Sequence, residues 1–201
     1  MTPRSRQLLI SLIVACAMFM QNLDSTIIAT ALPAIGNSLG ESPLSLNVAI
    51  TCYLLSLAVF IPISGWTADR FGACRVFTGA ILVFTLGSIG CGFANSLWML
   101  VLSRIVQGMG GAMMVPVGRL VLLRTVPKSE LVRAMSYVSV PALIGPVIGP
   151  PLGGLIVTYA SWHWIFFITS RSACSASCWS TCLSATWARR RCGRLTCAAL
   201  R

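Results

Sequence analysis

Two ionisable residues lie inside long apolar runs of this sequence, where a charge is costly and usually serves a function. At the helical rise of 1.5 Å per residue, Asp24 lies about 12 Å before Leu32, which ends its run. Arg104 lies about 10 Å into the run that begins at Leu97. If the two runs cross a membrane in opposite directions, the acid and the base lie at matching depth. This predicts an ion pair or a shared polar cavity that binds a proton or a cation, with a static packing pair as the alternative.

Polar residues recur at helical spacing beside both charges. Gln21 and Ser25 are assigned to the face of Asp24. Gln107 follows Arg104 by one helical turn and shares its face. The predicted proton or substrate site therefore consists of Asp24, Arg104, Gln107 and Gln21. The sequence offers no convergent set of nucleophile, base or metal ligands, so we predict no enzyme, no catalytic residue and no metal site.

Glycines recur every fourth residue in the stretch 145–154, which reads GPVIGPPLGG. This spacing places Gly145, Gly149 and Gly153 on one face of a helix, where small residues let two helices approach closely. The prolines of the stretch remove backbone donors and bend a helix. Spacing alone leaves a purely structural role and a functional role equally open.

Charged residues also gather in the link 65–75, between the second and third apolar runs. Gly72 permits a tight turn there. Asp69 is expected to bind a neighbouring helix N-terminus or an arginine, forming a latch that breaks on movement. The alternative is a solvated loop with an incidental carboxylate.

The amino-acid composition indicates which class of protein contains these residues. The 201 residues are 56% apolar and 9% charged, with a mean hydropathy of +0.84. A soluble domain carries about 25% charged residues, and a disordered chain is far less apolar. We therefore predict an all-α, polytopic membrane protein in contact with the lipid bilayer. The predicted spans are 8–32, 44–64, 76–94, 97–123 and 134–157, with an incomplete sixth run that begins at Trp162.

The positions of the basic residues predict the orientation. The formal net charge is +11, and the bases of the first 168 residues lie mostly in alternate links between the apolar runs. This pattern is the cytoplasmic bias of membrane proteins and not a nucleic-acid-binding face, so the N-terminus is predicted to be cytoplasmic. The bases concerned are Arg4, Arg6, Arg70, Arg75, Arg124, Lys128 and Arg133.

Five stretches, which together cover about residues 8–168, resemble motifs of the major facilitator superfamily. Three of them are Gly65-x-x-x-Asp69-Arg70-x-Gly72-x-x-Arg75, Arg104-x-x-Gln107-Gly108-x-Gly110-Gly111-Ala112 and Gly145-Pro146-x-x-Gly149-Pro150-x-x-Gly153-Gly154. The other two are the first-helix stretch 23–35 and the stretch 162–168. The first-helix stretch is similar to that of the fourteen-helix drug:proton antiporters (EmrB/QacA type).

The resemblance implies export of a small hydrophobic or cationic substrate across the cell membrane, driven by inward proton flow. Such folds contain three-helix repeats of inverted topology, which makes the first and fourth spans equivalent. Asp24 would be the proton or cation site, Arg104 its partner, and the proton the coupling ion, without any cofactor. Residues 145–154 would act in the conformational change and Asp69 in a cytoplasmic gate. Ala73 and Cys74 stand where the family usually has bases, which leaves Arg70 and Arg75 to carry the latch.

The chain changes character after residue 168. Residues 1–168 form the predicted N-terminal bundle, whereas residues 169–201 are rich in serine, arginine and cysteine. We hypothesise that this tail is read out of frame, with a poor sixth helix as the alternative. A transporter of this class needs two bundles, so the chain alone is expected not to transport. The alternative function is a non-transporting scaffold or dominant-negative partner that binds another transporter copy.

Overall fold

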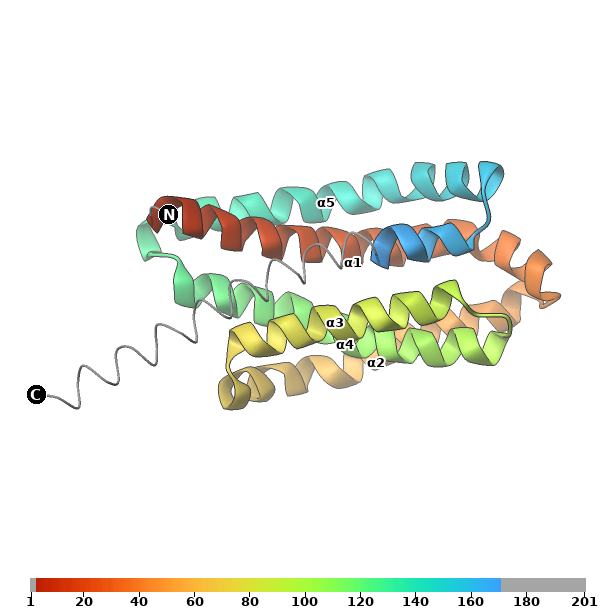
Figure 1. Ribbon diagram of the computed structural model, residues 1–201, viewed down its shortest axis with the longest axis horizontal. Helices are drawn as coiled ribbons and strands as arrows, with labels where there is room; N and C mark the ends of the chain where they lie inside the picture. The colour runs from red at the N-terminus through yellow and green to blue at the C-terminus, as the bar shows by residue number, and fades with distance from the viewer. Residues whose placement is uncertain (1–2, 171–201) are drawn as a thin grey trace, which may run out of the picture.

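Each of the five apolar runs forms one long helix in the computed structural model, which describes residues 3–170 (Figure 1). All five helices are long and apolar enough to cross a membrane, as predicted. A further helical segment, residues 163–170, follows them. The long helices are α1 (Pro3–Leu39), α2 (Pro43–Phe71), α3 (Ala73–Gly92), α4 (Leu97–Thr125) and α5 (Lys128–Tyr159).

The first helix continues past Leu32, where the sequence predicted that its span ends. α1 runs through Pro33 and ends only before Gly40, which has a φ of 67°. Its last turns are held by packing, because Ile35 is fully buried and Gly36 lies against Leu46 of α2. Tertiary contacts therefore outweigh the tendency of proline to end a helix.

The predicted link 65–75 is mostly helical. α2 extends to Phe71 and α3 begins at Ala73, so Gly72 alone separates them. Gly72 has a φ of 91°, and its N–H donates to the carbonyl of Ala68 at 3.0 Å. The predicted tight turn at Gly72 is confirmed, because a positive φ of this kind favours glycine.

The helices pack in two groups (Figure 1). In the first group, α1 packs along α5. In the second group, α4 packs against both α2 and α3. Contacts between α1 and α4 join the two groups. If α1 and α4 are equivalent helices of two repeats, the α1–α5 contact corresponds to the α4–α2 contact. This is the arrangement that inverted three-helix repeats produce. Consecutive helices run in opposite directions, so the links after α2 and α4 lie at one end of the bundle, called the basic end.

Two apolar clusters fill the interior. The first lies toward the basic end and includes Val14, Phe84 and Met114. The second lies toward the opposite end and includes Ile35 and Phe166. Asp24 and Arg104 belong to neither cluster and occupy the sequence positions between the two on α1 and α4. The fold therefore holds its buried charges between two apolar layers.

Candidate functional site

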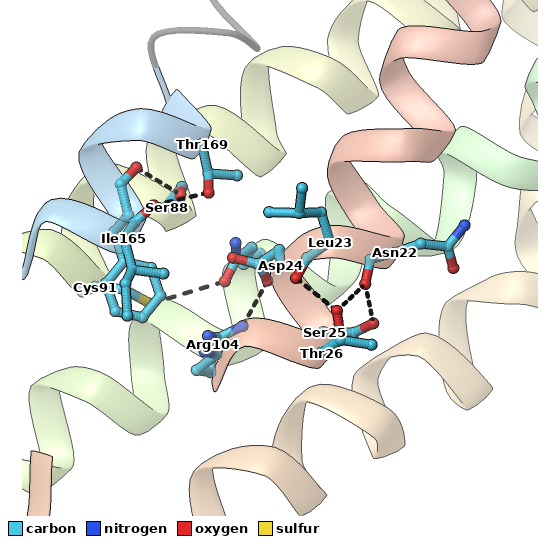
Figure 2. A network of polar contacts seen from close by, with 12 residues as sticks. Asn22, Leu23, Asp24, Ser25, Thr26, Ser88, Cys91, Arg104, Ile165 and Thr169 are labelled. Carbon is cyan, nitrogen blue, oxygen red and sulfur yellow. Dashed lines mark hydrogen bonds and ion pairs between the residues drawn. The ribbon is translucent and has the colours of Figure 1, made fainter. Parts of the chain in front are cut away.

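A buried ion pair joins α1 to α4 in the middle of the bundle (Figure 2). Nη1 of Arg104 donates to Oδ2 of Asp24 at 2.8 Å, and the two side chains are 1% and 0% exposed. The predicted contact between these residues is present, although they lie 80 residues apart in sequence. Burying two charges costs several kcal/mol per ion unless they are paired, on the order given for real proteins. The pairing therefore fixes the distance between α1 and α4 at this depth.

Both predicted amides lie beside the ion pair. Gln107 is fully buried, and its Oε1 lies 3.8 Å from the Sγ of Cys91. A methyl group on Gly111 would come 3.4 Å from both the Nε2 of Gln21 and the hydroxyl of Tyr53. The side chains of Gln21 and Tyr53 thus both lie against α4 at Gly111. The four predicted site residues lie close together.

The prediction for Ser25 is wrong. Ser25 is exposed, and its hydroxyl donates to the carbonyl of Asn22 on its own helix at 2.8 Å (Figure 2). Thr26 likewise donates to its own helix. Ser25 directly follows Asp24, and consecutive residues of a helix are about 100° apart around its axis, so the two side chains do not share a face.

Several buried atoms of this site have no hydrogen-bond partner among the described residues. They are Gln21 Oε1, Asp24 Oδ1, Tyr53 OH, Arg104 Nε, Arg104 Nη2 and Gln107 Nε2. Buried polar groups are almost always hydrogen-bonded, and such atoms call for an explanation. Here they concentrate around one carboxylate and one guanidinium. The site therefore has donor and acceptor atoms that the described residues leave unused.

Glycines and serines set the position of α4, which carries Arg104. A methyl group on Gly108 would come 2.9 Å from the carbonyl of Tyr53, and one on Gly110 would come 2.5 Å from the backbone nitrogen of Phe84. The hydroxyl of Ser56 donates to the carbonyl of Ile105 at 2.9 Å. The backbone of α4 is thus in close contact with α2 on one side and α3 on the other, as small residues permit.

Two aromatic residues of the site were missed by the sequence analysis. The Cζ of Arg104 lies 5.6 Å from the ring centroid of Tyr53 and 5.0 Å from that of Phe166. Both side chains are buried. Phe166 lies in the stretch 162–168, but nothing in the sequence pointed to a contact between either ring and Arg104, because aromatic residues are ordinary components of apolar helices.

The 163–170 segment continues past the predicted boundary at residue 168. Thr169 and Ser170 are helical and buried, and the hydroxyl of Thr169 donates to the carbonyl of Ile165 at 2.8 Å (Figure 2). The rest of the predicted tail, 171–201, lies outside the described residues. The hypothesis of a lost reading frame stays a prediction, which the nucleotide sequence across codons 160–201 would test.

The predicted latch has a different arginine. Oδ1 of Asp69 accepts from Nη2 of Arg124, in the last turn of α4, at 2.7 Å. Arg70, which was expected to carry the latch together with Arg75, has its Cζ 5.6 Å from the ring centroid of Trp66. Because α2 is helical through Phe71, the neighbouring residues 69 and 70 point in different directions. This geometry turns Asp69 toward α4 and Arg70 away from it.

We expect the Asp69–Arg124 pair to add little to stability. The two side chains are 68% and 50% exposed, and surface ion pairs contribute about 0–1 kcal/mol. Thermal unfolding of Asp69→Asn, Arg124→Gln and the double variant would give a coupling energy within this range. A coupling energy well above it would show that the pair holds the basic end closed.

The glycines of 145–154 pack against α1. A methyl group on Gly145 would come 3.3 Å from the carbonyl of Phe19, and one on Gly153 would come 3.3 Å from the carbonyl of Ile27. Gly149 faces Thr26 in the same way. The close approach predicted for this face is confirmed. The remaining motif residues, Pro146, Pro150 and Gly154, are exposed, and α5 stays helical through all its prolines.

Comparisons with known proteins support a transporter fold. The family model described as Major Facilitator Superfamily matches residues 14–176. Proteins called putative multidrug resistance protein MdtD, from Salmonella paratyphi B and Salmonella typhi, are each 53% identical over 156 residues. These matches cover 78% of this chain and 33% of each relative, so the chain spans about a third of the length of the curated relatives it matches.

Solved structures show the same fold. The proton:xylose symporter XylE superposes with a TM-score of 0.79 at 14% identity, covering 90% of this chain and 45% of that one. A bacterial homolog of the human lysosomal transporter Spinster superposes with a TM-score of 0.71 at 18% identity, covering 90% and 43%. At these identities the likeness concerns the fold alone.

Proposed function

The chain belongs to the major facilitator superfamily, and on this premise we propose that it supplies the N-terminal bundle of a proton-coupled exporter of small hydrophobic or cationic molecules. Membership of a transporter family agrees with the prediction that the chain is not an enzyme. The relatives are named for multidrug resistance, which supports efflux and does not favour the alternative of a non-transporting scaffold. The fourteen-helix drug:proton antiporters are the subclass that the motifs resemble.

The buried Asp24–Arg104 pair carries this proposal. A proton and a cationic substrate compete for the same carboxylate, and uptake of either one removes the counter-charge of Arg104. Loading of the proton therefore favours release of the substrate, and a ligand that binds one state better shifts the population of that state. This competition produces antiport. The unpartnered atoms of Gln21 and Gln107 would receive polar groups of the substrate.

The proposed conformational parts lie apart from this site. The Asp69–Arg124 pair is exposed and thus breaks and re-forms at small cost, as a gate requires. The glycine face of α5 lets that helix slide on α1. By the positive-inside rule, the basic end faces the cytoplasm of a multi-pass protein in the cell membrane.

A chimera tests the proposal. Residues 1–168 would replace the matching third of the Salmonella relative, and drug tolerance would be measured in an efflux-deficient strain. We expect the chimera to raise tolerance to at least one cationic or hydrophobic drug. Asp24→Asn should return tolerance to the level of the empty vector, because an amide cannot exchange a proton at this position.

The matched control is Glu41→Gln, an exposed acid in the link between α1 and α2. It should leave tolerance unchanged. The intact relative serves as the positive control. An inactive chimera beside an active relative would reject export by this bundle, and an Asp24→Asn chimera as active as its parent would reject Asp24 as the proton site.

A further inference from the structure

The guanidinium of Arg104 has fewer oxygen partners than its burial demands. Arg104 is 1% exposed, and Nη1 donates to Asp24. Its Nε and Nη2 have no hydrogen-bond partner among the described residues. A buried guanidinium normally satisfies its donors with oxygen atoms. The described residues thus offer this cation one oxygen partner, the carboxylate of Asp24.

Two ring faces lie close to the guanidinium of Arg104. Tyr53 of α2 and Phe166 of the 163–170 segment have their ring centroids 5.6 Å and 5.0 Å from the Cζ of Arg104. Both distances are within the roughly 6 Å over which an aromatic face attracts a cation. The attraction is stronger in a site without water, and the rings are 3% and 0% exposed.

Both ring-bearing residues are held by their backbones. The hydroxyl of Ser88, on α3, donates to the carbonyl of Phe166 at 3.3 Å (Figure 2). The close approach of Gly108 fixes the backbone of Tyr53 against α4. The ring of Tyr53 thus belongs to the α2–α3–α4 side of the bundle. Phe166 lies in a segment that contacts α3 through Ser88 and also packs with Ile27 and Ile28 of α1, the helix that carries Asp24.

No other carboxylate is placed to replace Asp24. The sequence contains only three further acids, Glu41, Asp69 and Glu130. Asp69 and Glu130 lie at the basic end, and Glu41 lies at the opposite end. The groups that surround Arg104 from the packed helices are Asp24, the amides of Gln21 and Gln107, and the side chains of Tyr53, Cys91 and Phe166. When Asp24 takes up a proton, it can still accept a hydrogen bond but no longer supplies a counter-charge. The two ring faces still present a negative potential to the cation.

We propose that Tyr53 and Phe166 are positioning residues that hold the Arg104 cation in place while Asp24 carries a proton. This inference rests on the proposed function, in which Asp24 is the proton site. A ring face keeps its negative potential whatever the protonation state of Asp24, whereas the ion pair does not. Arg104 therefore keeps its two ring contacts while Asp24 is neutral, and it is ready to pair again when the proton leaves.

A fluorine series at position 166 tests this. Phe166 would be replaced by mono-, di- and trifluorophenylalanine, which weaken the negative face stepwise and nearly preserve the shape of the ring. The series would be made in the parent chain and in the Asp24→Asn chain, which mimics the protonated carboxyl. The readout is the midpoint of thermal unfolding in detergent, which does not require transport.

We expect the midpoint to fall with each fluorine in the Asp24→Asn chain, by about 2–4 °C over the series if the contact has the usual strength of a buried cation–π pair. In the parent chain the fall should be less than half as large, because the carboxylate shares the cation. Tyr53→Phe, which keeps the ring, should show no such loss. Fluorination of Phe84, a fully buried ring in the first apolar cluster, is the control and should give no graded change in either chain.

Equal slopes in the two chains, or no slope in either, would overturn the proposal. If the Asp24→Asn chain yields too little protein for unfolding curves, the amount of folded protein eluted in size-exclusion chromatography would be compared across the fluorinated variants. A folded yield that does not fall with each added fluorine would equally overturn the proposal. Failure here is distinct from failure of the proposed function, which the tolerance conferred by the chimera reports independently of ring fluorination.

Discussion

Asp24→Ala is expected to lower the free energy of unfolding by about 3–5 kcal/mol, because it leaves a buried guanidinium without its counter-ion. Arg104 is 1% exposed, and Asp24 is its only described carboxylate partner. Arg104→Ala should cost a similar amount by leaving the carboxylate alone. Unfolding of each purified variant by heat or by denaturing detergent would measure the loss.

The double variant Asp24→Leu, Arg104→Met separates charge burial from packing. Replacing both members of a buried pair by apolar side chains of similar volume is often neutral or stabilising. We expect the double variant to unfold within about 1 kcal/mol of the parent and its chimera to be inactive in drug tolerance. Glu41→Ala, at an exposed position, is the control. Single variants as stable as the parent would show that Asp24 and Arg104 are not buried as a charged pair.

Gly110→Ala is the second change with a large expected effect. The added methyl group would come 2.5 Å from the backbone nitrogen of Phe84 and 2.7 Å from the carbonyl of Ala80. These are backbone atoms of α3, so no side chain can rotate away and the two helices must separate. Overpacking of this kind costs about 1–3 kcal/mol, occasionally more. Because α4 also carries Arg104, the chimera with this change should lose drug tolerance as well.

Gly79→Ala is the matched control on α3. No atom lies within 4 Å of the added methyl group, and alanine favours a helix over glycine by up to about 1 kcal/mol. Thermal unfolding should therefore show Gly79→Ala equal to or above the parent and Gly110→Ala clearly below it. Equal midpoints for the two variants would contradict the close contact between α3 and α4.

The sequence determined the main features that depend on distance along the chain. The thickness of a bilayer and the rise of a helix fixed the number of spans and the depths of Asp24 and Arg104. Those depths made a contact between the two residues possible, and the structure shows it as an ion pair. Four-residue spacing placed Gly145, Gly149 and Gly153 on one face, and that face does pack closely against α1.

Only the tertiary structure decided which side of each helix meets which neighbour. A helix that is apolar all round carries no pattern that fixes its rotation, so the ring contacts of Tyr53 and Phe166 were not predictable. The pairing of Asp69 with Arg124 depended on the extension of α2 by about two helical turns beyond the predicted end at residue 64. Spacing fixes depth in the membrane, whereas rotation and partners are decided by the packing of side chains from distant parts of the chain.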